Sequence, residues 1–145
     1  MTTLDRRRGL GAVVAAGAAA LVGGAATADV ARAQKVVYHL ADAEKVEFVL
    51  GNLRNHLAGA SPITLAVVVH GPALHVFRTA SGNVAVASDV RELTGVGVAF
   101  HACANTMAAM KLALSDLLPG FAVAERGGVV LLADLQAQGW IYLRP

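Results

Sequence analysis

The only cysteine of the chain, Cys103, is the side chain best suited to covalent chemistry. It lies within residues 100–107, FHACANTM, where an apolar run typical of a strand gives way to a run typical of a helix. The first turn of a helix has unpaired backbone N–H groups and a partial positive charge, and both favour a thiolate. A cysteine at such a position is predicted to be a nucleophile. The alternative is a small buried side chain without reactivity, the usual state of a free cysteine.

Three of the five histidines follow predicted strands. His39 follows the first, His70 the second and His101 the third, two residues before Cys103. In open parallel α/β sheets, ligands bind beyond the carboxyl ends of the strands, so we expect these side chains at one edge of the sheet. There His101 is predicted to act in catalysis with Cys103, by stabilising the thiolate or transferring a proton. His70 and Asn105 are predicted to bind substrate.

Two kinds of chemistry suit this edge. In the first, Cys103 attacks a sulfane-sulfur donor and carries the sulfur as a persulfide, which would make the protein a sulfur carrier or a sulfurtransferase. In the second, His39, His70, His101 and Cys103 bind a metal such as copper or zinc. A third possibility is a non-catalytic interaction module with a buried, unreactive cysteine. We expect no cofactor, because the sequence has no phosphate-binding loop, paired-cysteine motif or nucleophile elbow.

Patterns typical of strands and of helices alternate along the chain. The elements that they predict must position these residues. Strands are predicted at residues 35–39, 63–69, 96–100, 121–124 and 140–143. Helices are predicted after an N-cap at Asp42, before Gly95, and at residues 105–118 and 128–138. This alternation predicts a three-layer α/β fold, with about five mostly parallel strands and helices on both faces of the sheet.

The first 33 residues have the pattern of an export signal. Arg6, Arg7 and Arg8 precede the uncharged residues 9–28, and a small-x-small sequence ends at Ala33. Adjacent arginines before a weakly hydrophobic segment favour the twin-arginine route. We therefore expect cleavage after this leader and a periplasmic protein whose domain comprises residues 34–145. If the leader were retained, its uncharged stretch would attach the protein to a membrane.

Most of the excess positive charge belongs to the leader. It holds four of the 12 basic residues and two of the 10 acidic ones, which leaves eight of each in residues 34–145. Nucleic-acid binding needs clustered lysine and arginine, so we expect no nucleic-acid partner. The length of residues 34–145 is that of a single domain.

Five blocks of the sequence resemble the DsrE/DsrF-like sulfur-relay family. They are VVYH at residues 36–39, VVHGP at 68–72, GVGVAFHACANTM at 95–107, LLPG at 117–120 and GWIYLRP at 139–145. The most specific parts are the A-C-x-N-T-M block and the terminal W-x-Y-x-R-P. The predicted leader makes the chain similar to an exported subgroup of this family.

The resemblance implies a small α/β fold with a parallel sheet, assembled into a homo-oligomer, commonly a trimer or hexamer. It also implies that Cys103, which matches the family's cysteine, accepts sulfur as a persulfide from a donor protein or passes it to an acceptor protein. Because the leader directs this chain outward, a role in tRNA thiolation is disfavoured. The leading prediction is a periplasmic sulfur carrier or sulfurtransferase.

Overall fold

The computed structural model describes residues 33–145. The predicted export signal lies outside the described residues, except for Ala33. Within residues 33–145, no helix is both long enough and apolar enough to cross a membrane.

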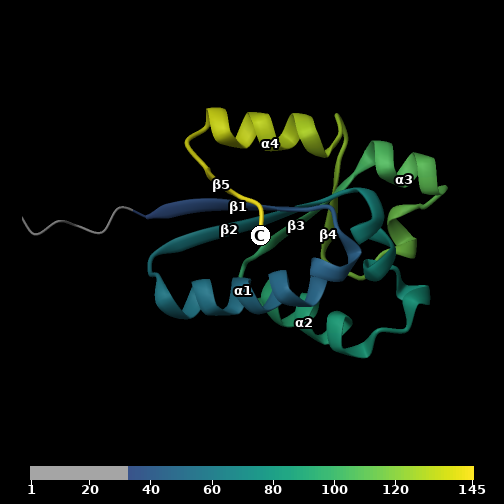
Figure 1. The fold of residues 1–145 in the computed structure, drawn as a ribbon, viewed down its shortest axis with the longest axis horizontal. Helices are drawn as coiled ribbons and strands as arrows, with labels where there is room; N and C mark the ends of the chain where they lie inside the picture. The colour runs from purple at the N-terminus through teal and green to yellow at the C-terminus, as the bar shows by residue number, and fades with distance from the viewer. Residues whose placement is uncertain (1–32) are drawn as a thin grey trace, which may run out of the picture.

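Five parallel strands form one sheet in the order β4-β3-β2-β1-β5 (Figure 1). Their bounds are β1 Gln34–Leu40, β2 Ile63–Val69, β3 Ala99–Cys103, β4 Phe121–Ala124 and β5 Ile141–Leu143. The β-branched strand β2 lies in the middle of the sheet and is buried from Leu65 to its end, as a strand covered on both faces must be. The predicted three-layer α/β fold is confirmed.

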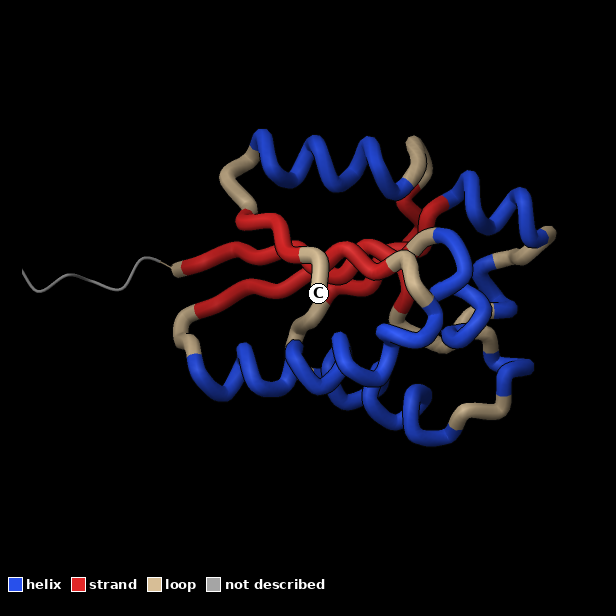
Figure 2. Tube along the Cα trace, in the orientation of Figure 1, coloured by secondary structure: helices blue, strands red, loops and turns tan. Residues whose placement is uncertain are grey.

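Helices cover both faces of the sheet (Figure 2). They are α1 Val46–Gly59, α2 Val84–Gly95, α3 Ala104–Met110 and α4 Gly128–Ala137, with short 3-10 helices η1 Ala43–Lys45, η2 Gly71–Phe77, η3 Thr79–Ser81 and η4 Leu114–Asp116. Helices α1 and α2 lie below the sheet in Figure 1, whereas α4 lies above it and α3 stands at the carboxyl ends of the strands.

The two faces bury different amounts of apolar surface. The larger cluster packs α1, α2 and η2 against the sheet, and the smaller one joins α4 to three side chains of β1 and β2: Val37, Ala66, Val68, Leu132 and Leu135. Burial of such a side chain contributes roughly 1.5–3 kcal/mol to stability. The larger cluster therefore contributes most of the stabilisation, while the thinner α4 side holds the polar groups described below.

Two predicted helix features were wrong. The helix expected at residues 105–118 ends at Met110, where Lys111 adopts a left-handed conformation with φ of 55°. The chain turns there because Leu118 returns to the core and its N–H donates to the carbonyl of Phe77 at 2.9 Å. Tertiary packing thus overrides the helical spacing. Asp42 precedes η1, but its side chain makes no capping hydrogen bond.

The third strand lies three residues later than the predicted 96–100. Residues 96–98 instead close the turn after α2, where Gly97 has φ of +95° and the N–H of Val98 donates to Leu93 at 2.9 Å. The shift places His101 inside β3 and makes Cys103 its last residue. Before α2, the chain forms η2 and η3, and Asn83 then caps α2 by accepting from the N–H of Val86.

Candidate functional site

Cys103 connects a strand to a helix at the carboxyl edge of the sheet. It is the last residue of β3 and the N-cap of α3, with an extended backbone. Its side chain points to the face covered by α4, and it is 5% exposed. Neighbouring atoms therefore cover most of the residue.

Hydrogen-bond donors near the sulfur set its acidity. Burial alone raises the pKa of the Cys103 thiol, but these donors outweigh burial and lower this pKa. The donors are the backbone N–H of Gly128, the hydroxyl and backbone N–H of Thr106 and the backbone N–H of Asn105. The first turns of α3 and α4 thus converge on one sulfur. This arrangement favours a nucleophilic thiolate.

The Thr106 hydroxyl is oriented by a second hydrogen bond. Its oxygen accepts from the backbone N–H of Gly71 at 3.1 Å. Because this bond occupies an acceptor position, the hydroxyl proton is free for the sulfur of Cys103. The loop after β2 and the first turn of α3 are thereby tied to the same site.

Two consecutive glycines allow α4 to approach the cysteine. A β-carbon on Gly128 would stand 3.2 Å from the Cβ of Cys103 and 3.6 Å from the Cβ of His70. At Gly127, where φ is +96°, a β-carbon would stand 2.7 Å from the side-chain nitrogen of Asn105. Sequence reasoning missed these two residues. The sequence feature that could have identified them is a pair of glycines at the start of a predicted helix. Glycines at such a position let the helix backbone approach a neighbouring segment closely.

His39 and His70 meet beside this cysteine. Their Nε2 atoms are hydrogen-bonded to each other, and Nδ1 of His39 is 2.6 Å from the hydroxyl of Tyr142 on β5. Burial, followed by the charges of His70 and Arg144 and opposed by Asp42, lowers the pKa of His39 to about 4. Burial likewise lowers the pKa of His70, so both rings are neutral at pH 7.

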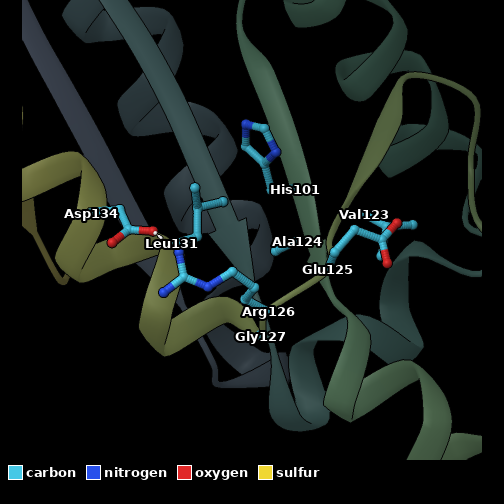
Figure 3. Close-up of a pocket in the computed structure, with 8 residues that line it drawn as sticks. All are labelled: His101, Val123, Ala124, Glu125, Arg126, Gly127, Leu131 and Asp134. Carbon is cyan, nitrogen blue, oxygen red and sulfur yellow. Dashed lines mark hydrogen bonds and ion pairs between the residues drawn. The ribbon is translucent and has the colours of Figure 1, made fainter.

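His101 faces a neighbouring cavity (Figure 3). The cavity has a volume of about 240 Å³, and its other lining residues are Val123, Ala124, Glu125, Arg126, Gly127, Leu131 and Asp134. Burial lowers the pKa of His101, which is half-buried. Side chains two residues apart on a strand share a face, so His101 and Cys103 point to the same side of the sheet. His101 is not among the groups that lower the pKa of the thiol.

The structure brings some of the predicted site residues together and leaves others apart. His70 and Cys103 both lie beside Gly128, and Asn105 lies beside the preceding Gly127. His39 contacts His70. However, no group of three or more His, Cys, Asp or Glu side chains within residues 33–145 is arranged to hold a metal ion. Within the described residues, His39, His70, His101 and Cys103 are therefore not gathered at one point, because His101 lines the separate cavity.

Comparison with known proteins gives a family and a fold. A sequence model of the DsrE/DsrF-like family matches residues 18–145. A protein of unknown function from Methanobacterium thermoautotrophicum is 35% identical, with a TM-score of 0.70 over 77% of this chain and 99% of that one. A conserved protein of unknown function from Bacteroides thetaiotaomicron has a TM-score of 0.56 at 13% identity over 77% of this chain and 95% of that one, which shows the fold alone. Among curated proteins, none matches the chain.

Proposed function

Since the chain belongs to the DsrE/DsrF-like family, we propose that it carries sulfane sulfur as a persulfide on Cys103, as a sulfur carrier or sulfurtransferase. Membership of the family indicates a role in sulfur relay in general. The observation that supports the finer proposal is the position of Cys103 at the start of α3 and against Gly128 of α4, where nearby donors lower the pKa of its thiol. These donors suit an anion on the sulfur better than a neutral thiol.

The proposed reaction has two sulfur-transfer steps. The Cys103 thiolate attacks the outer sulfur of a donor such as thiosulfate or a polysulfide. The donor's sulfur–sulfur bond breaks, its electron pair leaves with the rest of the donor, and Cys103 becomes a persulfide anion. An acceptor thiolate then attacks the terminal sulfur and returns Cys103 to a thiolate. No oxidant is needed, because one sulfur–sulfur bond replaces another in each step.

The surroundings of the sulfur support separate roles for the neighbouring side chains. We assign the cavity beside His101 to the donor, because it opens on the same face of the sheet as Cys103. His70 lies beside Gly128 and Asn105 beside Gly127, and we assign both side chains to limiting the space in which the persulfide forms.

Location and assembly are part of the same proposal. The arginine-containing leader supports export to the periplasm, and cell fractionation tests this. Exposed apolar side chains on β5 and α4, Ile141 at 49% and Val129 at 68%, support assembly into a homo-oligomer. We propose a trimer or hexamer that meets a donor or acceptor protein, and light scattering of the purified chain gives its mass.

One observation favours a different function. Cys103 is only 5% exposed, as expected for an interaction module whose cysteine has no reaction to perform. That function requires slow modification of the native protein by a small thiol reagent. Rapid modification of the native protein would contradict it.

Thiocyanate formation tests the proposed transfer chemistry. Cyanide removes the outer sulfur of a persulfide, so protein treated with polysulfide and then freed of excess reagent should release one thiocyanate per chain. The Cys103→Ser variant should release none while keeping the circular dichroism spectrum of the wild type. Equal release from both proteins would overturn the proposal.

A further inference from the structure

Two adjoining cavities lie beside α2, the helix that covers the opposite face of the sheet from α4 (Figure 1). The first has a volume of about 190 Å³ and lies at the start of α2, and the second has a volume of about 260 Å³. Ala87 and Leu118 line both cavities, so together they form one groove, which we call the α2 groove. Ligand pockets usually measure roughly 300–1,000 Å³, so an organic ligand would extend through both cavities.

The α2 groove contains two arginines that have no acidic partner. Arg78 lines the first cavity and Arg91 the second, and neither forms an ion pair within residues 33–145. No aspartate or glutamate of this part of the chain lines either cavity. The groove therefore has a positive charge that the described residues do not neutralise. The remaining arginines of residues 33–145 each pair with a carboxylate: Arg54, Arg126 and Arg144.

Nε of Arg78 lacks a hydrogen-bond partner. Among the side-chain nitrogen and oxygen atoms that are buried within residues 33–145, it is the one without such a partner. Buried polar groups in native proteins are nearly always hydrogen-bonded. The backbone of Arg78 is held in place by an antiparallel bridge to Leu117. An acceptor from outside the described residues would satisfy this N–H, and a carboxylate can bind Nε–H and a neighbouring Nη–H of an arginine together.

Asn83 adds a second donor at the same end of the groove. Its side-chain oxygen accepts from the N–H of Val86 at 3.1 Å, which leaves the amide NH₂ to donate. Thr79 and Ser81 also line the first cavity, but their hydroxyl protons are already donated to backbone carbonyls. Arg78 and Asn83 are therefore the side chains of this cavity that can donate to an anion.

The middle of the α2 groove is apolar. Ala87 and Leu118 line both cavities, and Pro119 continues the apolar lining of the second. Asn83 and Arg91 are eight residues apart, which is about 12 Å along a helix axis. Helical side chains lean toward the amino end of the helix, so the guanidinium of Arg91 can reach back over part of this distance. An aliphatic chain of several carbon atoms would cover the remainder.

We propose that the α2 groove binds a small organic dianion, in which an aliphatic chain joins two carboxylates. One carboxylate pairs with Arg78 and Asn83, the chain covers the apolar middle of the groove, and the second carboxylate pairs with Arg91. The side chain of Arg78 turns toward the groove as the anion binds, which gives its Nε–H an acceptor. Because Cys103 points to the opposite face of the sheet, this binding does not depend on sulfur transfer.

Calorimetric titration of the purified protein with suberate, an eight-carbon dicarboxylate, tests the proposal. Octanoate serves as the monocarboxylate of equal length. Suberate should bind once per chain and about tenfold more tightly than octanoate, which leaves one arginine without a partner. Arg78→Gln and Arg91→Gln should each weaken the binding of suberate by about tenfold or more. Arg91 is exposed, so its variant tests the proposal even if Arg78→Gln does not fold.

The matched control is Lys45→Gln, which removes one positive charge from η1 and lines neither cavity. It should bind suberate like the wild type, as should Cys103→Ser. Absence of saturable binding, equal affinity for suberate and octanoate, or an unchanged affinity in Arg91→Gln would overturn the proposal. Sulfate that binds as tightly as suberate would also overturn it, because the site would then be one for inorganic anions only. A protein that binds suberate but takes up no sulfur would refute the proposed function and leave this site in place.

Discussion

Gly128 lies so close to Cys103 that a β-carbon on the glycine would stand 3.2 Å from the Cβ of the cysteine. This approach brings the first N–H of α4 near the sulfur, where it helps to lower the pKa of the thiol. The cysteine at the end of β3 therefore depends on a helix that begins 25 residues later in the chain.

Substitution of Gly128 by alanine should separate α4 from the sulfur. The added methyl group crowds Cys103 and Val68, which should lower the free energy of unfolding by about 1–3 kcal/mol. Loss of the N–H contact should also raise the pKa of the thiol. Urea unfolding and the pH dependence of alkylation measure the two effects. Gly51→Ala is the control, since nothing lies within 4 Å of its β-carbon position in α1, and it should stabilise the protein by roughly 0.5–1 kcal/mol.

Substitution of Thr106 by valine should remove one donor to the sulfur while keeping the side-chain shape. We expect the pKa of Cys103 to rise and alkylation at neutral pH to slow. The backbone N–H of Gly71 also loses its acceptor, which should cost about 1–2 kcal/mol of stability. Thr106→Ser retains the hydroxyl and should keep the wild-type pKa. A wild-type alkylation profile in Thr106→Val would contradict the role assigned to this hydroxyl.

Stability should depend on pH through His39. Its pKa is about 4 in the folded protein, against an ordinary value of 6.5. Between these pH values the unfolded chain holds more protons, so the free energy of unfolding should fall as pH drops from 6.5 to about 4 and then level off. The contribution of this ring is at most about 3 kcal/mol. Urea titrations of the wild type and His39→Gln measure it, and equal pH slopes in the two proteins would contradict the burial of a neutral ring.

The ion pair beside the His101 cavity should control how fast anionic donors load sulfur onto the protein. Arg126 and Asp134 are 3.1 Å apart and largely exposed, so Asp134→Asn should change stability by less than about 1 kcal/mol. Without Asp134, the Arg126 charge is free to attract an anion. Loading by thiosulfate should therefore become faster in Asp134→Asn and slower in Arg126→Ala, while alkylation by neutral iodoacetamide stays the same in both. An equal change with both reagents would show that the pair acts on Cys103 itself and not on the donor.

The architecture could be predicted from the sequence, and so could the presence of several of the site's side chains at one edge of the sheet. Apolar strands alternate with helical patterns, which predicts the parallel sheet, and parallel strands place His39 and His70 at the same edge. Local patterns failed where distant packing decides the structure. The helix after Cys103 stops at Met110 because Leu118 must reach the core near Phe77, which no local spacing shows.

The site depends on the same distant relationships. The contact between His39 and Tyr142 exists because β5 returns to lie beside β1, at the far end of the sheet from β4. The spacing of hydrophobic residues does not reveal the order of the strands in the sheet, so Tyr142 could not be identified as part of the site. The close approach of Gly128 to Cys103 likewise needs the position of α4 over the sheet.

The most direct test of sulfur carriage is the intact mass of the native protein, recorded without reductant before and after treatment with polysulfide or thiosulfate. If Cys103 carries sulfur, the mass should rise by one sulfur atom per chain, and this gain should be reversed by a reducing agent and absent in Cys103→Ser. An unchanged mass in a folded wild type whose Cys103 still reacts with iodoacetamide would show that Cys103 does not carry sulfur.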